Sequence, residues 1–207
     1  GSGRMAEREF MKAVKNNRSF ALFDKSIPEN LEGYLFPETY HIWRNIKPVE
    51  FIAMMVSEFN REVEPLYEKN KKSLKLKISE IITLASLIER EAKVPRERPV
   101  IAAVYYNRLK EGMLLECDAT IQYILGDSKE NLTYADLKIN SPYNTYLYKG
   151  LNLPVKLNPG LDSIKAAMEP EKVNYLFYVL NSLKNDGSHV FSRDYSQHLE
   201  NVRKYLR

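Results

Sequence analysis

The sequence predicts an α+β fold in which central helices pack with a small antiparallel sheet that includes a C-terminal β-hairpin. Two patterns support this prediction. Apolar residues recur at three- and four-residue steps through the middle of the chain, as along the buried face of a helix. Near the C-terminus, two short runs rich in β-forming residues flank a polar turn, which is typical of a hairpin.

The N-terminal third is expected to hold two helices joined by irregular chain. A short helix is predicted over 4–15. The aromatic segment 31–40 is interrupted by Gly and Pro, so we expect extended chain with turns there. A long helix is predicted over 48–70, opened by a proline, unless Pro65 kinks or ends it earlier.

In the middle of the chain, three more helices are predicted after a lysine-rich connector over 69–77. Ser79 is the expected N-cap of a helix that ends near residue 93. The next helix starts near residue 98 and stops at Gly112, and Asp118 is expected to cap a short one that Gly126 ends. The remaining expected elements are a loop over 140–160, a helix over 162–168, strands over 175–180 and 189–192, and a last helix over 196–205.

Composition excludes several classes of protein. The formal net charge of +4 in 207 residues is small for a nucleic-acid binder, and the one basic run, 69–77, is typical of a solvated connector. A single cysteine, Cys117, rules out an internal disulfide framework and a multi-cysteine metal site. The three histidines lack the spacing of metal ligands. No apolar run approaches the length that crosses a bilayer.

The helix predicted over 79–93 carries the best candidates for acid–base chemistry. Its apolar residues form one arc, Ser86 faces the polar side, and Glu89 and Glu91 project on opposite flanks of the arc. A carboxyl drawn toward an apolar face loses hydration, so its pKa should rise, as a general acid near neutral pH requires. The alternative is that either glutamate is a rim residue, paired to Arg90, Arg96 or Arg98. Periodicity does not choose between them.

Two further clusters carry polar side chains. The loop 141–146 presents aromatic faces, an amide and hydroxyl groups, which can stack on and hydrogen-bond a sugar, although many such loops are only turns. Residues 114–120 carry Glu116 and Asp118, the latter with an N-cap role as its simpler explanation. Ser86 lacks the glycines of a nucleophile elbow, and no phosphate-binding glycine-rich loop is present.

Taken in order, seven segments resemble the YceG-like family of endolytic murein (lytic) transglycosylases. The resemblance covers about residues 30 to 205. The matching segments are LEGYLFPETY (31–40), LASLIERE (84–91), RPVIAAVYYNRL (98–109), GMLLECDAT (112–120), SPYNTY (141–146), NPGLDSIKAAM (158–168) and the stretch 175–201. Any one motif is weak, but seven ordered ones are specific.

The resemblance implies a bacterial cell-wall enzyme that acts on peptidoglycan glycan strands outside the cytoplasm. It implies one N-terminal membrane helix, absent from this chain, and a LysM-like subdomain ahead of the catalytic domain. We therefore expect residues 1–30 to hold an expression scar (Gly1-Ser2-Gly3) and a remnant of that subdomain, and 31–207 to be the YceG-like catalytic domain. A cell-wall synthesis complex is the expected protein partner. No nucleic acid, metal or cofactor is expected.

The family's catalytic residue is the first glutamate of the E-x-E pair, which falls on Glu89; Glu91 then becomes a supporting residue. The chain has Glu116 where the family commonly has Gln, Ala119 where it has Pro, and an altered turn at 150–154. Asp118 and Asn107 are expected mainly to support the architecture. The candidate substrate-binding residues are Tyr143, Asn144, Thr145, Glu116, Asp118, Asn107 and Glu38.

The resemblance also implies a mechanism. Glu89 would protonate the oxygen of the β-1,4 bond between N-acetylmuramic acid and N-acetylglucosamine. As a carboxylate it would then accept the proton of the muramoyl C6 hydroxyl, which closes a 1,6-anhydro ring. Two alternatives stay open: a hydrolase of the same glycan in which Glu116 or Asp118 activates a water, and a non-catalytic glycan-binding or cell-wall assembly factor.

Overall fold

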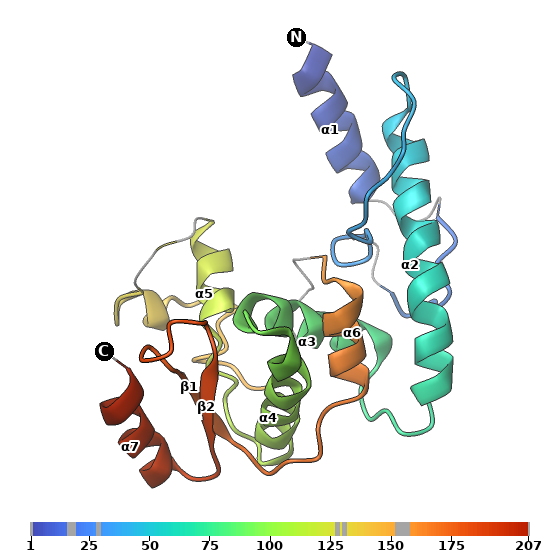
Figure 1. The fold of residues 1–207 in the computed structure, drawn as a ribbon. Coiled ribbons are helices and arrows are strands. Elements are labelled where there is room, and N and C mark those ends of the chain that lie inside the picture. Colours follow the sequence, from blue (N-terminus) through green and yellow to red (C-terminus); the bar gives the residue numbers. More distant parts are fainter. Residues whose placement is uncertain are drawn as a thin grey trace.

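The computed structural model describes residues 2–15, 20–27, 30–126, 129, 132–151 and 158–206, and it confirms the predicted α+β class. None of the helices in these ranges is both long and apolar enough to cross a bilayer. The elements are α1 (Ser2–Val14), α2 (Pro48–Asn70), α3 (Ile78–Glu91), α4 (Arg98–Lys110), α5 (Asp118–Leu125), α6 (Leu161–Met168), β1 (Phe177–Leu180), β2 (His189–Ser192) and α7 (Tyr195–Tyr205), with 3₁₀ turns at Pro95–Glu97 and Asp136–Lys138 (Figure 1).

Helix α3 lies at the centre of the molecule, with α4 and α6 packed against it (Figure 1). Every residue from Ile81 to Ile88 is buried, including Thr83 and also Ser86, which was expected on the polar side. Both hydroxyls donate to carbonyls one turn back in the same helix, so their burial leaves no unpaired donor. A helix enclosed on all sides is a rigid support for the groups at its end.

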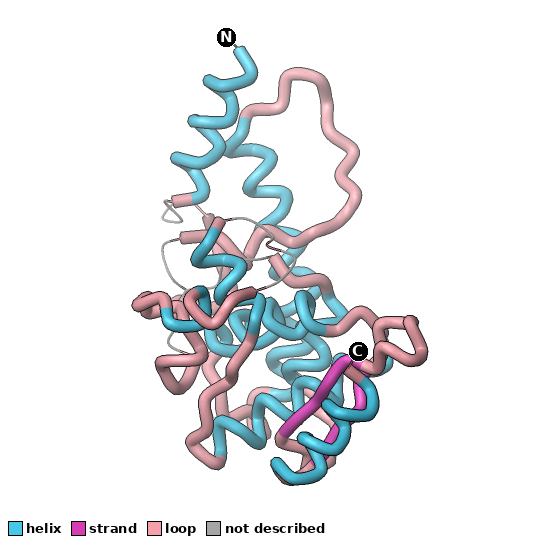
Figure 2. Tube along the Cα trace, turned by 90° about the vertical axis from the view of Figure 1, so that its left-hand side faces the viewer, coloured by secondary structure: helices cyan, strands magenta, loops and turns pink. Residues whose placement is uncertain are grey.

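A second, smaller core joins α1 and α2 to the segment that follows residue 30. It consists of Val14, Leu31, Leu35, Ile52 and Val56. The Leu31 N–H donates to the Val14 carbonyl at 2.9 Å, which ties the segment to the end of α1. From there residues 37–47 form a long loop that projects beside α2 (Figure 2). The extended, turn-rich chain predicted for 31–40 is confirmed.

Two predicted helix caps are wrong. Helix α3 begins at Ile78, and its N-cap is Lys77 instead of Ser79, because the Glu80 carboxylate accepts the Lys77 N–H at 2.8 Å. The N-cap of α5 is Cys117, which leaves Asp118 as the first helical residue, where a negative charge still suits the helix dipole. The other boundaries agree well: α2 continues through Pro65 to Asn70.

The predicted C-terminal hairpin is confirmed, with a first strand that starts two residues later than expected. Strands β1 and β2 pair antiparallel, Phe177 opposite Ser192 and Leu180 opposite His189, and α7 packs against both. A carboxylate from the turn between α3 and α4 holds this hairpin against the helices. Glu97 accepts the His189 backbone N–H at 3.1 Å, and its Oε2 lies 2.8 Å from His189 Nδ1. The hairpin is therefore fixed relative to the C-terminal end of α3.

Candidate active site

The last turn of α3 directs its two glutamates toward different neighbours. Glu89 faces the first residues of α4 and α6, whereas Glu91 faces α5 and the hairpin. Among the described residues, the two glutamates share no hydrogen-bond or ion-pair partner. The two flanks predicted for these residues are thus two separate environments.

Glu89 lies where the N-termini of two helices meet. Its side chain is 35% exposed, and its Oε2 accepts the Gly160 N–H at 3.3 Å, at the N-cap of α6. Its Oε1 is 3.8 Å from the Arg98 guanidinium, so of the three arginines considered as partners, Arg98 is the one in ion-pair range. The helix terminus and the guanidinium both stabilise negative charge on the carboxylate. The exposed remainder is open to a ligand.

The backbone around Gly160 is held by a distant segment of the chain. The Asn158 side-chain oxygen accepts the N–H groups of Gly33 at 2.7 Å and Leu35 at 3.4 Å. This contact joins the segment 31–36, which precedes α2, to the chain that enters α6. Three of the sequence blocks singled out above, 31–40, 84–91 and 158–168, therefore meet beside Glu89.

Glu91 has neutral partners. Cys117 Sγ donates to its Oε1 at 3.2 Å, and the Tyr178 hydroxyl donates to its Oε2 at 3.1 Å. The Tyr178 hydroxyl also lies 3.1 Å from that of Tyr105, which is fully buried. Burial raises the pKa of Glu91, although the two hydrogen bonds work in the opposite direction. Burial likewise raises the pKa of the Cys117 thiol, so it is an inert donor here.

The loop 141–146 is built around two buried polar side chains. Asn144 donates to the carbonyls of Leu137 and Ile139, both at 2.9 Å. Thr145 Oγ1 accepts the Cys117 N–H at 2.9 Å and lies 3.0 Å from the Thr120 hydroxyl. Both residues are almost fully buried, and in this structure their side chains shape the loop. Direct contact of either with a sugar stays a prediction.

Tyr143 is the more accessible member of the same loop. It is partly exposed, and its ring meets that of Tyr123 on α5 edge-on, with the centroids 5.5 Å apart. The contact holds the ring, and its partial exposure is compatible with the sugar-stacking role predicted for it. That role stays a prediction.

Two exposed acidic residues of the 114–120 segment have protein partners. The Tyr146 hydroxyl donates to Asp118 Oδ1, which links the start of α5 to the loop 141–146.

Glu116 Oε2 lies 3.0 Å from Arg108, and Glu116 has a positive φ of 51°. The Arg108 guanidinium also donates to three backbone carbonyls, those of Leu114, Leu115 and Leu176. Arg108 thus organises this segment, a role that its sequence position did not reveal.

The other two predicted substrate-binding residues lie in different surroundings. Asn107 donates to the carbonyls of Val173 and Tyr175, both at 2.9 Å, and so supports the approach to the hairpin. Glu38 is exposed at the start of the 37–47 loop, where its carboxylate accepts the Thr39 N–H. No described contact joins either residue to Glu89.

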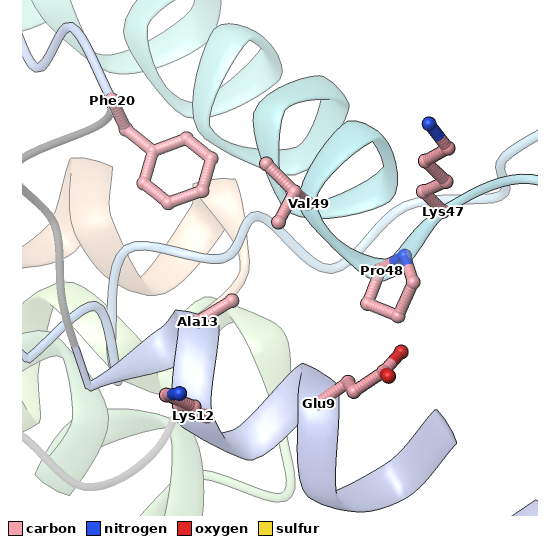
Figure 3. Close-up of a pocket in the computed structure, with 7 residues that line it drawn as sticks. All are labelled: Glu9, Lys12, Ala13, Phe20, Lys47, Pro48 and Val49. Carbon is pink, nitrogen blue, oxygen red and sulfur yellow. The ribbon is translucent and has the colours of Figure 1, made fainter. Parts of the chain in front are cut away.

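The cavity drawn in Figure 3 lies apart from these residues. It has a volume of about 410 Å³ and is lined by Glu9, Lys12, Ala13, Phe20, Lys47, Pro48 and Val49, between α1 and the start of α2. None of them is a predicted site residue. Within the described ranges, no three His, Cys, Asp or Glu residues come together in a way that could hold a metal ion.

The sequence did not reveal three of the residues that give the two glutamates their different surroundings. Gly160, Tyr178 and Tyr105 were not singled out, since each lies far from α3 in sequence or carries no charge. The nearest signal was the segment NPGLDSIKAAM, which contains Gly160 at a helix start. The turn at 150–154 lies largely outside the described residues.

Comparison with known proteins supports the resemblance. A model of the YceG-like family matches residues 3–204. An endolytic murein transglycosylase of Bacillus subtilis is 38% identical over 97% of this chain and 54% of its own length. One from Streptococcus pneumoniae is 32% identical over 91% of this chain and 34% of its own length. The chain therefore spans about half, or less, of these relatives.

A solved structure agrees in fold as well as in sequence. The crystal structure of a yceG-like protein from Listeria monocytogenes superposes with a TM-score of 0.74 at 34% identity, over 96% of this chain and 62% of that one. The family match covers nearly every described element, including the end of α3 that carries Glu89. This chain belongs to the YceG-like family.

Proposed function

We propose that this chain is the catalytic part of an endolytic peptidoglycan lytic transglycosylase. It would cleave the β-1,4 bond between N-acetylmuramic acid and N-acetylglucosamine within glycan strands and leave 1,6-anhydro-muramoyl ends. Its relatives are endolytic murein transglycosylases, and this chain spans part of their length.

One observation carries the assignment of Glu89. It is a partly exposed carboxylate at the end of a buried helix, held between the Gly160 N–H and Arg98. Those contacts fix its direction, while its exposed part can reach a ligand. Glu91, two residues on, has both carboxylate oxygens in hydrogen bonds, one to a thiol and one to a phenol.

Glu89 would act in two steps. It first donates a proton to the glycosidic oxygen as the bond to the muramoyl C1 breaks, with an oxocarbenium-like transition state. A bound glycan would exclude water from the partly exposed carboxyl and protect the transition state from hydrolysis. The resulting carboxylate, stabilised by Gly160 and Arg98, then accepts the proton of the C6 hydroxyl as its oxygen attacks C1. Because the nucleophile is within the substrate, no second carboxylate is required.

The wider setting follows from the same proposal. Residues 31–207 would be the catalytic domain, and the whole protein would act outside the cytoplasm, attached to the membrane and working with cell-wall synthesis proteins. Tyr143 would offer a stacking surface to a sugar, and Asn144 and Thr145 would shape the loop that meets it. Asp118 would tie that loop to α5, and Asn107 would support the approach to the hairpin.

Analysis of the products tests this function. Purified glycan strands would be incubated with the protein, and the new ends identified by mass spectrometry. Anhydro-muramoyl ends are expected. Reducing ends alone would point to a hydrolase, and intact strands that remain bound to the protein would point to a binding or assembly factor.

A further inference from the structure

Arg98, the first residue of α4, has a largely buried guanidinium with few partners. Its side chain is 16% exposed. Its terminal nitrogens approach Glu89 Oε1 at 3.8 Å and Asp162 Oδ2 at 4.0 Å, both beyond hydrogen-bond distance. Its Nε is buried, and no atom of the described chain accepts a hydrogen bond from it.

An unused, buried guanidinium is costly for the folded protein. A buried donor without an acceptor costs free energy, and the cost is greater for a charged group. Arg108 shows the ordinary solution in this fold, since its guanidinium donates to three carbonyls and a carboxylate. The Arg98 side chain is 16% exposed, against 9% for Arg108, and it makes no such bonds to the described part of the chain. One of its terminal nitrogens lies 3.8 Å from Oε1 of the partly exposed Glu89.

We infer that Arg98 is a binding residue for an acyl oxygen of the sugar that lies against Glu89. The inference rests on the proposed function for the identity of that sugar. The planar guanidinium matches a carbonyl or carboxylate oxygen better than an ammonium does, because it presents two parallel N–H groups. In a muramoyl unit such oxygens belong to the N-acetyl group at C2 and the lactyl group at C3. Both groups are close to C1, where Glu89 would act.

Binding measurements in an inactive background test this assignment. Glu89→Gln prevents turnover, so the Kd for purified glycan strands can be measured by calorimetry with Arg98→Lys or Arg98→Gln added. We expect Kd to rise about tenfold or more for both, since Lys keeps the charge but loses the paired donors. Arg96→Gln removes a charge from an exposed residue two positions earlier and is the matched control, with Kd unchanged. A Kd within twofold of the parent for Arg98→Lys would overturn the inference.

Comparing two ligands shows whether Arg98 binds the N-acetyl or the lactyl oxygen. If Arg98→Lys weakens binding of chitin oligosaccharides, which carry N-acetyl but no lactyl groups, the N-acetyl oxygen is the ligand. If it weakens only muramoyl-containing strands, the lactyl oxygen is. Either result supports the inference.

A purely structural role for Arg98 would give a different signature. With Glu89 intact, the inference expects Arg98→Lys to raise KM more than it lowers kcat. A fall in kcat at unchanged KM and unchanged Kd would mean that Arg98 only orients Glu89, and would contradict it. The binding measurement does not require turnover, so its outcome is independent of the product analysis. If the wild-type protein forms no anhydro ends, the proposed function fails, and the inference about Arg98 is still tested by the Kd values.

Discussion

Glu89 and Glu91 stand two residues apart on one helix, yet their surroundings differ in kind. Glu89 meets a backbone N–H, a guanidinium and solvent, which leave part of its carboxylate accessible. Glu91 meets a thiol and a phenol, and burial raises its pKa. The difference arises from which elements pack on each side of α3: α4 and α6 on one side, α5 and the hairpin on the other.

The comparison teaches that identical side chains acquire different roles from the chain that packs around them. A carboxyl that must give and take a proton has to reach its substrate. A carboxyl enclosed by neutral donors instead joins α3 to α5 and to the hairpin. Changing each glutamate in the same way is therefore informative, because the two variants should fail differently.

The largest expected effect is on turnover. Glu89→Gln keeps the shape of the side chain but removes its ability to give and take a proton, so kcat should fall by about 10²–10⁴-fold. The melting temperature should stay close to that of the wild type, since the side chain lies at the surface of the site. Activity on glycan strands and thermal unfolding would be measured on the same preparation. Near-normal turnover would exclude Glu89 as the acid.

The next effect is on stability, at Glu91. Glu91→Ala strands the Cys117 thiol and the Tyr178 hydroxyl and leaves a cavity, which should lower the free energy of unfolding by about 2–4 kcal/mol. Glu91→Gln keeps the volume and an acceptor, so a loss below about 1 kcal/mol is expected. Urea denaturation measures both. Equal losses for Ala and Gln would show that the hydrogen bonds at Glu91 do not stabilise the fold.

The pH dependence of stability should separate the two glutamates again. Burial raises the pKa of Glu91 in the folded protein, so protonated Glu91 stabilises the fold. Its contribution to the free energy of unfolding is complete below the ordinary glutamate pKa. It is lost as pH rises through the raised folded value, with a slope of at most about 1.4 kcal/mol per pH unit for one proton. Stability profiles from acid to neutral pH should therefore be flatter for Glu91→Gln than for the wild type. Glu89→Gln retains Glu91 and its two donors and serves as the control, in which the fall assigned to Glu91 should persist.

The smallest effect is expected at Gly160. Its φ of −74° suits any residue, and an added Cβ would meet Glu89 Oε2 at an ordinary 3.6 Å, so Gly160→Ala should change kcat by less than about threefold. Gly187→Ala is the contrasting variant: φ is +76° and the Cβ would come within 2.9 Å of Lys93, so a loss of about 1–2 kcal/mol is expected. A large activity loss in Gly160→Ala would mean that the site tolerates no added volume beside Glu89.

Most of the fold followed from local patterns in the sequence. The periodicity of α2, α3 and α4 and the β-forming runs of the hairpin depend on neighbouring residues, and these elements appear where they were expected. The N-caps predicted at Ser79 and Asp118 were wrong because both helices start earlier. Lys77 is the N-cap of α3, where the Glu80 carboxylate accepts its N–H, and Cys117 is the N-cap of α5. Local competition of this kind is hard to resolve from residue type alone.

The site was only partly predictable. Periodicity placed Glu89 and Glu91 on opposite flanks but could not rank them, because their partners at 98, 160, 117 and 178 reach them only through the tertiary fold. The resemblance to the YceG-like family made that choice. Burial of Asn144 and Thr145 was likewise hidden, since it depends on Thr120, Leu137 and Ile139.

The most direct test compares Glu89→Gln and Glu91→Gln in one assay of anhydro-muramoyl ends released from purified glycan strands. The two changes are chemically identical and two residues apart. If Glu89 is the acid and base, Glu91→Gln should retain at least about a tenth of the wild-type rate while Glu89→Gln loses at least about 10²-fold. Equal losses in the two variants, or a greater loss in Glu91→Gln, would contradict the division of roles between them.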